Sequence, residues 1–419
     1  MSAGLLLAGA LPRLLPITAG PADLAGHTAR YGPAPSGLGR RQREALIAEV
    51  DRAGLTGRGG AGFPTARKLA AVAAGHAPVV VANGTEGEPA SAKDRVLMAR
   101  SPQLVLDGAV LAAEITGASE AVIVVHRDVR EIVDEAVAER ARVPLDRVRL
   151  EVRTAADGCV AGQASAVVRW VQRGVPAPTA TPPRLAQRGL RGAPTLVQNV
   201  ETLAHLALIA RYGAAWFRSA GTPAEPGTML VTVLGAVRQP GVLEVGIGTP
   251  VGRLLDLAGG ASAPPQALLL GGYFGAWVAA DLALDRPFSS AGLADLGAGP
   301  GAGLVAALPA GACGLAETAR VVRYLAGESA GQCGPCRFGL PALAGQVERL
   351  ADGRGADQGL LRRWLGQVDG RGGCAHPDGV VRLVRSALRT FGAEMEEHAG
   401  GRCSGVRTDV LPVPVGGSR

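Results

Sequence analysis

Two short runs in the first third of the chain are apolar at every position. Residues 78–82 and 121–125 are typical of strands that are buried on both faces inside a parallel sheet. Apolar stretches with helical spacing follow them at 102–115 and 129–140, and a further helix is expected at 41–53. Because strands alternate with helices, the pattern predicts an open α/β sheet.

The pattern changes after a Gly- and Pro-rich break at residues 222–227. The side chains of residues 229–234 are expected to alternate between the two faces of a strand. After a short turn, residues 240–245 form a second strand that runs back beside the first, which predicts a β-hairpin. A short helix at 251–257 and an apolar strand at 267–270 complete a small α+β unit.

The remaining sequence is helical in pattern. Residues 1–45 show only weak periodicity and are expected to form an irregular leader. The length of 419 residues predicts two or three domains. We divide the chain into the leader, an α/β domain at 46–222, a hairpin-containing domain at 223–306 and a helical domain at 307–419. The helices of the last domain are predicted at residues 315–327, 340–350, 359–368 and 380–398.

No apolar run reaches the roughly 18 positions needed to cross a bilayer, so we predict no direct membrane span. The apolar segment at 4–15 is interrupted by Pro12 and Arg13 and lacks the basic start of a signal peptide. We therefore expect a cytoplasmic protein. Its six cysteines would then be free thiols or metal ligands rather than disulfides.

The formal net charge is +7, but the arginines are scattered, so we predict no nucleic-acid binding. We expect the basic residues to form a surface that faces an acidic redox partner. Among the 43 basic residues only Lys68 and Lys93 are lysines. Lysines kept among so many arginines indicate a need for a compact ammonium group, which the planar guanidinium does not imitate.

A glycine-dense loop at residues 57–62 precedes a predicted helix at 64–74. Successive glycines let backbone N–H groups turn toward an anion, and the start of the helix adds the positive end of its dipole. A phosphate fits such a loop, although an ordinary tight turn has the same composition. Lys68 favours the anion site, because it lies one to two turns into the helix and its ammonium can reach the ligand.

A polar segment at residues 83–89 directly follows the strand predicted at 78–82. Ligands of open α/β sheets bind outside the carboxyl ends of the strands. Asn83 can both donate to and accept from the edge of a heterocycle, and Glu86 and Glu88 can accept from ribityl or ribose hydroxyls. The alternative is a polar surface loop whose carboxylates bind nothing.

Three cysteines near the C-terminus have the spacing of a metal site. Cys333 and Cys336 are separated by two residues, which lets both thiolates reach one centre, and a distant third ligand such as Cys374 is common in iron–sulfur sites. The Gly-Pro pair between the first two favours this reading over three unrelated buried thiols. Cys159 and Cys313 are expected to be structural.

These motifs, in this order, resemble the flavin-binding core of the NADH-binding flavoprotein subunit of respiratory complex I. The resemblance rests on residues 57–68, 83–89 and 93–95, and on residues 194–203, which are similar to the family's later flavin loop. The hairpin domain is similar to the family's β-grasp (ubiquitin-like, SLBB) domain. A related core occurs in NAD-linked hydrogenases and formate dehydrogenases.

The resemblance implies an oxidoreductase of the NADH dehydrogenase type that passes electrons from FMN to an iron–sulfur cluster, with NAD(P)H as the candidate substrate. The expected partners are other redox subunits or a ferredoxin. A membrane redox protein is also expected as a partner, but only an indirect one. The residues implied in FMN binding are Gly57, Arg58, Gly59, Gly60, Gly62, Lys68, Asn83, Glu86, Glu88, Gly162, Asn199 and Thr202. The residues implied in cluster binding are Cys333, Cys336 and Cys374.

One departure from the family concerns the cluster. The family has three cysteines spaced C-x-x-C-x-x-C besides the distant one, whereas this chain has Ala330 at the first position. The remaining three ligands would hold a [4Fe-4S] cluster or a ligand-deficient [3Fe-4S] cluster. His376 and Cys403 are the alternatives for a fourth ligand.

Other departures concern the nucleotide. Where the family has Gly-Glu-Glu-Thr, Gln163 and Ala164 replace two carboxylates, one of which contributes to the family's NADH pocket. In addition, Thr85 stands at a usual Asp and Gln198 at a usual Asn. The flavin frame is therefore better supported than the nicotinamide site.

Three functional hypotheses follow. The first is an NAD(P)H-linked flavoenzyme subunit. The second is an electron relay supplied by a ferredoxin or another subunit, which the lost carboxylates favour. The third is a non-catalytic scaffold, against which the two lysines and the three cysteines argue.

Overall fold

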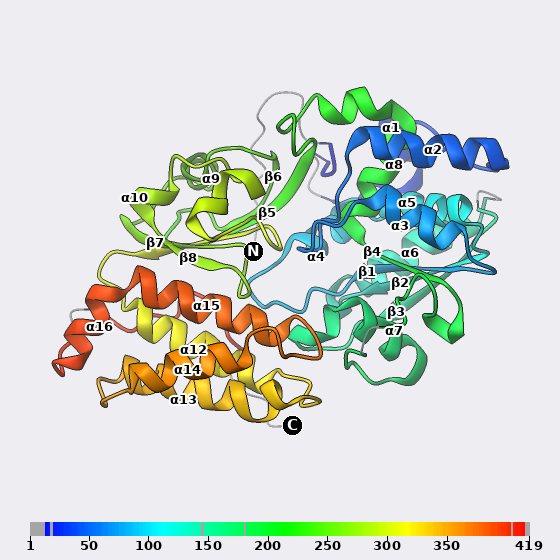
Figure 1. Ribbon diagram of the computed structural model, residues 1–419. Helices are drawn as coiled ribbons and strands as arrows, with labels where there is room; N and C mark the ends of the chain where they lie inside the picture. Colours follow the sequence, from blue (N-terminus) through cyan, green and yellow to red (C-terminus); the bar gives the residue numbers. More distant parts are fainter. Residues whose placement is uncertain (1–12, 17–19, 144–145, 180–181, 404, 415–419) are drawn as a thin grey trace.

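The computed structural model describes residues 13–16, 20–143, 146–179, 182–403 and 405–414, which form three units (Figure 1). A four-stranded parallel sheet with helices on both faces is followed by a five-stranded mixed sheet and then by a group of helices. The predicted fold class, an open α/β domain followed by a β-grasp unit and C-terminal helices, is confirmed.

The first sheet has four parallel strands in the order β3-β2-β1-β4. The predicted strands correspond to β1 (Val79–Gly84) and β2 (Glu120–Val125), whereas β3 (Arg149–Thr154) and β4 (Thr195–Asn199) were not predicted. Strand β3 lies at the edge of the sheet and its side chains are partly or fully exposed, so its sequence carries charges instead of an apolar run.

Helices cover both faces of this sheet because its central strands β1 and β2 are buried on both sides. Alternate residues point to opposite faces, so that Val80 and Ala82 join the larger core while Val79 and Val81 join the smaller one. The smaller core is closed by α7 (Ala164–Arg173). The larger core is covered by α3 (Thr65–Ala73), α5 (Pro102–Thr116), α6 (Arg130–Ala141) and α8 (Val200–Arg218).

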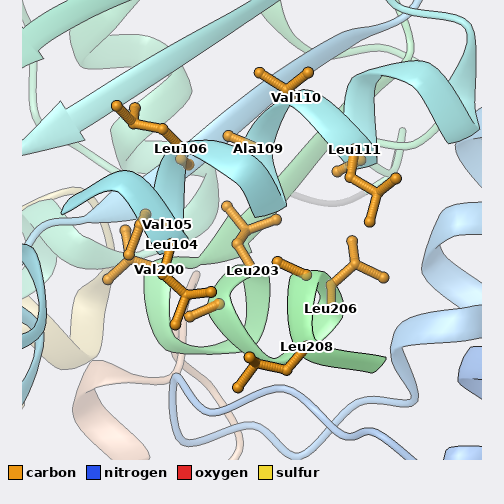
Figure 2. Close-up of a cluster of buried hydrophobic side chains, with 14 of the residues drawn as sticks. Leu104, Val105, Leu106, Ala109, Val110, Leu111, Val200, Leu203, Leu206 and Leu208 are labelled. Carbon is orange, nitrogen blue, oxygen red and sulfur yellow. The ribbon is translucent and has the colours of Figure 1, made fainter. Parts of the chain in front are cut away.

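Helices α5 and α8 approach each other closely at Gly108. A Cβ atom on this residue would lie 2.0 Å from the Leu203 carbonyl oxygen, so only glycine allows the contact. Leucine and valine side chains of the two helices pack together around this point (Figure 2). The packing fixes the start of α8, which borders the candidate site.

The remaining helices of this unit are α1 (Leu24–Tyr31), α2 (Arg40–Ala53) and α4 (Lys93–Arg100). Helix α1 lies within the leader, so the expectation of an irregular segment is wrong for these residues. The helix escaped prediction because only His27 and Tyr31 of its residues are buried, and the apolar periodicity is correspondingly weak. Among the described residues no single helix has the length and apolar composition of a membrane span.

The second unit is a five-stranded mixed sheet in the order β6-β5-β9-β7-β8. The predicted hairpin is confirmed, because β5 and β6 pair antiparallel. Strand β9 lies at the centre of the sheet and runs across the predicted domain boundary at residues 306–307. The strands are β5 (Thr228–Gly235), β6 (Gly241–Gly246), β7 (Pro265–Leu270), β8 (Ala276–Ala279) and β9 (Leu304–Pro309), joined by α9 (Val251–Leu257), α10 (Ala280–Ala283) and α11 (Ser290–Leu293).

The third unit is helical and is coloured yellow to red in Figure 1. The helix predicted at 380–398 is in fact two helices, which separate at Phe391 because its ring is buried against Trp277 and Gly314. A shared core joins these helices to β7 and β9. The helices are α12 (Gly314–Gly327), α13 (Leu340–Ala351), α14 (Gln358–Val368), α15 (His376–Thr390) and α16 (Gly392–Ala399).

Candidate functional site

The candidate site lies where the direction of the chain through the first sheet reverses. From β1 the chain moves outward to β2 and β3, and then returns to place β4 on the other side of β1. Asn83 of β1 and Asn199 of β4 are register partners at the carboxyl ends of these strands. Open α/β sheets bind ligands in the crevice at such a point, so the two asparagines border the expected crevice.

The glycine loop lies beside Asn199. The amide of Arg58 donates to Thr202 Oγ1 at 2.9 Å, and a Cβ on Gly59 would contact Asn199 at 3.4 Å. Gly60 and Gly62 have φ angles of +98° and +61°, which side chains disfavour. The loop is therefore held at the start of α8, next to the crevice.

Two predicted ligand residues hold this loop in place through their side chains. The Arg58 guanidinium is buried and donates to Thr56 Oγ1 at 3.0 Å and to the Pro226 carbonyl at 3.2 Å. Thr202 is fully buried beneath the loop. Their backbone and hydroxyl groups shape the cradle, and the arginine also ties it to the segment before the second sheet.

Lys68 enters the same region from α3. Its Nζ donates to the Val197 carbonyl at 2.5 Å and to Gln198 Oε1 at 3.1 Å. An ammonium group has three donors, so one remains for a ligand. Burial lowers the pKa of Lys68 to about 8, and a nearby anion would favour its charged form.

The predicted residues after β1 have different surroundings. Asn83 Nδ2 donates to the Gly162 carbonyl at 2.9 Å, which joins two of the predicted positions. Glu86 accepts from the Ser91 hydroxyl at 2.6 Å and from the backbone amides of Asp94 and Arg95 at the start of α4. The structure thus shows Glu86 capping a helix, and its contact with a ligand stays a prediction.

The Glu88 carboxylate is buried against the loop that follows β7. A Cβ on Gly272 would lie 2.6 Å from its carboxylate, so the side chain is lodged against the second sheet. Burial raises the pKa of Glu88 to about 8, and its Oε1 has no hydrogen-bond partner among the described residues. The carboxyl group borders a cavity of about 1160 Å³ that extends between the strand ends and α12.

Lys93, the second lysine, lies in a buried ionic group beneath the site. Its Nζ is 2.8 Å from both Asp94 Oδ1 and Glu201 Oε2. Burial alone would lower the pKa of Lys93, but the two carboxylates raise it above its usual value. Glu201 also accepts from the Leu230 amide of β5 at 2.9 Å. Sequence reasoning singled out Lys93 but missed the two carboxylates, although Asp94 is its neighbour in the chain.

Two buried polar atoms in this region need a partner. Thr85 Oγ1 and Gln163 Nε2 make no hydrogen bond to any described residue. They flank Gly162, where a Cβ would lie 3.2 Å from the Thr85 carbonyl. Because buried polar groups are nearly always hydrogen-bonded, a ligand with oxygen and nitrogen at its edge fits here. FMN offers both, so the residues present fit this cofactor.

The three predicted cluster ligands are close together at the start of α13. Burial, and then the thiols of Cys333 and Cys374, raise the pKa of Cys336 to about 12. The segment Pro335–Gly339 is a π-helix, a distortion often found at functional sites. Clustered thiols are the donors that iron–sulfur centres require, so this group fits such a cluster.

Of the two alternatives for a fourth ligand, Cys403 is wrong. It lies with Cys313 and His398, and His398 contacts the Leu350 carbonyl at the far end of α13. The ten-residue separation from Leu340 corresponds to about 15 Å along a helix. His376 remains, because its Nε2 faces the Leu325 carbonyl at 2.8 Å and its Nδ1 has no partner among the described residues.

The cluster loop contacts the segment that bears Gly162. Gln332 donates to the Pro178 carbonyl at 3.0 Å and accepts from Arg169 of α7 at 3.1 Å. Four residues earlier, Glu328 accepts from the Cys159 amide at 3.0 Å. These contacts hold the cysteine-bearing loop against the flavin side of the molecule.

In comparisons with known protein families, three family models match successive parts of the chain. The family model for the Nuo51 FMN-binding domain matches residues 50–208, and the SLBB domain model matches residues 230–272. The model for the NADH-ubiquinone oxidoreductase-F iron-sulfur binding region matches residues 316–398. The expected FMN, SLBB and iron–sulfur regions are therefore confirmed.

The chain is similar over most of its length to named proteins. An F-type subunit of NADH-quinone oxidoreductase from Rhizobium meliloti (strain 1021) is 30% identical, over 86% of this chain and 90% of that protein. The F-type subunit from Streptomyces coelicolor is 32% identical, over 85% of this chain and 83% of that protein. A chain of an H2-reduced NAD+-reducing [NiFe]-hydrogenase matches with a TM-score of 0.82 and 30% identity, over 98% of this chain and 69% of that chain. The protein belongs to the family of F-type subunits of NADH-quinone oxidoreductase, and it is an FMN-to-iron–sulfur electron-transfer subunit.

Proposed function

We propose that this chain accepts electrons from NADH at FMN in the β1–β4 crevice and passes them to a cluster held by Cys333, Cys336 and Cys374. The observation that carries the proposal is the docking of the cluster loop on the segment at residues 158–178. When bound, FMN exchanges electrons with a hydride donor in pairs and with a cluster singly. The proposal places FMN on one side of the contact between the cluster loop and residues 158–178, and the cluster on the other side.

The proposal gives each group of residues a part in holding FMN. Backbone N–H groups of the loop at 57–62 and the ammonium of Lys68 bind the phosphate. Asn83 and Asn199 position the cofactor at the strand ends, and the unpartnered atoms of Thr85 and Gln163 bind its polar edge. None of these side chains has to act as an acid or base, because the redox chemistry belongs to the cofactor.

Replacing Lys68 with methionine is expected to weaken FMN binding by about 1.5–3 kcal/mol, the usual value of a hydrogen bond to a charged group. Titration calorimetry with flavin-free protein measures this change. Arg67→Met is a matched control, since Arg67 is exposed on the same helix, and it should bind FMN like the wild type. Equal losses in both variants would contradict a direct contact with Lys68.

The same contact predicts a pH dependence. Lys68 has a pKa of about 8 in the free protein, so above that pH it must regain a proton to pair with the phosphate. FMN affinity should therefore be steady from about pH 7 to 8 and then fall by up to about tenfold per pH unit. Lys68→Met should lack this fall, and an unchanged fall in the variant would assign it to another group.

Oxidation of NADH is expected to be slow, because Gln163 and Ala164 remove acceptors for the nucleotide. The variant Gln163→Glu also loses the Nε2 donor to FMN, so the steady-state assay with an artificial acceptor is run at saturating FMN. Under these conditions Gln163→Glu should raise kcat/KM for NADH by about threefold to tenfold, as one hydrogen bond contributes about 0.5–1.5 kcal/mol. Rapid, saturable turnover by the wild type with no gain in Gln163→Glu would show that these substitutions do not matter.

A second candidate function is a relay that takes electrons from a ferredoxin or another redox subunit, and the same two substitutions favour it. Reduction of the bound flavin by a reduced ferredoxin, with no reduction by NADH, would support this alternative. In either case we propose that the chain works in a multi-subunit redox complex. We also propose a cytoplasmic location, where thiols such as the six free ones of this chain stay reduced.

A further inference from the structure

A second group of metal-binding side chains lies away from the flavin and the cluster. Cys313, His398 and Cys403 each offer one ligand atom, and these atoms lie within 4.8 Å of one another. Cys313 precedes α12 and His398 belongs to α16, and both are buried, whereas Cys403 follows α16 and is exposed. Three segments of the chain thus converge on one point.

The imidazole of His398 is oriented as a metal ligand would be. Its Nδ1 lies 3.0 Å from the Leu350 carbonyl of α13, which requires the proton to be on Nδ1. The lone pair of Nε2 then points toward the Cys313 sulfur, 3.6 Å away. Metal-binding histidines almost always donate their second ring nitrogen to a carbonyl or carboxylate in this way.

The donor set selects the metal. Two thiolates and one imidazole are the ligands of tetrahedral zinc sites, and soft sulfur donors disfavour magnesium and calcium. Glu394 borders the fourth position, because its Oε2 lies 3.6 Å from the Cys313 sulfur while it accepts from the Gly314 and Leu315 amides. The fourth coordination position of the metal is therefore open to a carboxylate or a water.

Residues 405–414 of the C-terminal tail lie against the segment that bears Cys313. The Cys313 amide donates to the Val406 carbonyl at 2.8 Å, and the Val406 amide donates to the Gly311 carbonyl at 2.7 Å. Further on, the Leu411 amide donates to Glu317 at 2.6 Å and its side chain is fully buried. A metal bound by Cys403 would fix the start of this tail to α12 and α16.

We propose that Cys313, His398 and Cys403 form a structural zinc site that fastens the C-terminal tail to the helical domain. The site is separate from the iron–sulfur ligands, which lie at the other end of α13. It contributes no electron carrier, because zinc has no redox chemistry, and its effect is on the order and stability of the tail.

Metal analysis of the FMN- and cluster-loaded protein tests the proposal. The wild type should hold equimolar zinc, and Cys403→Ser should weaken zinc retention against a chelator by at least about tenfold, since even second-shell changes cost 10- to 100-fold. Cys403 is exposed, so this variant should fold and keep its iron. Cys374→Ser is the matched control, which should lose iron and keep zinc.

X-ray absorption at the zinc edge of the wild type gives a test that does not depend on any variant. Two sulfur neighbours at about 2.3 Å and two lighter neighbours at about 2.0–2.2 Å are expected. Wild-type protein without zinc, or with a disulfide joining Cys313 and Cys403 in mass spectrometry, would overturn the proposal. Zinc with only oxygen and nitrogen neighbours, or full retention in Cys403→Ser, would do the same.

Discussion

Replacing Cys336 with serine is expected to remove the iron–sulfur cluster while FMN stays bound. Cys336 is the most deeply buried of the three predicted ligands, and with Ala330 at the first family position there is no fourth cysteine to take its place. A serine hydroxyl is a poor ligand for iron compared with a thiolate. Iron content should fall by more than about tenfold, as measured by iron and sulfide analysis with flavin extraction.

Cys159→Ser is the control for this variant, because Cys159 is not a predicted cluster ligand and its sulfur lies 3.5 Å from the Tyr324 hydroxyl. It should keep both cofactors. The complementary change is Ala330→Cys, which supplies the family's missing ligand. If the wild type holds a three-iron cluster, electron paramagnetic resonance should show its oxidised signal, and Ala330→Cys should convert the protein to the four-iron form. Wild-type protein that takes up no iron after anaerobic reconstitution would contradict cluster binding by these cysteines.

Replacing Lys93 with methionine is expected to destabilise the fold more than any surface change. The variant leaves Asp94 and Glu201 as buried carboxylates without their cation, and breaking a buried ion pair costs about 3–5 kcal/mol. The same change would loosen the contact with β5, because Glu201 also holds the Leu230 amide. Denaturant unfolding of the flavin-free protein measures the loss.

The pH dependence separates this effect from simple loss of packing. In the wild type, burial raises the pKa of Asp94 to about 6 even though Lys93 opposes it. Without Lys93 the folded pKa rises further above its unfolded value, so stability is lost as pH increases. The deficit of Lys93→Met should be larger at pH 8 than at pH 5. A constant deficit would point to packing alone. Arg40→Met, which removes an exposed pair with Glu44, should cost less than about 1 kcal/mol.

The sequence predicted elements well where a local pattern determines them. The apolar runs within β1 and β2 were predicted, whereas the charged edge strand β3 was not. Strand β9 was also missed although its six residues are apolar, so an apolar run alone did not identify every strand. The β-hairpin and the first three C-terminal helices were also predicted. The break at Phe391 was not, because it depends on a ring contact with Trp277 from another unit.

The candidate site was predicted as a set of residues but not as an arrangement. The order of strands, which brings Asn83 beside Asn199, is a long-range property that no local pattern reveals. A carboxylate after a strand looks the same in sequence whether it caps a helix, as Glu86 does, or is buried against the second sheet, as Glu88 is. The approach of Cys403 to Cys313 likewise depends on the return of the chain after α16.

Light-driven reduction of the bound FMN, without oxygen and with EDTA as the electron source, tests the central claim most directly because it does not depend on the natural donor. Flavin absorption and the electron paramagnetic resonance of frozen samples are followed together. Electron transfer from FMN to the cluster predicts that the reduced-cluster signal grows as the flavin is reduced, and that Cys336→Ser shows flavin reduction alone. Fully reduced flavin beside a cluster that stays oxidised would contradict the account.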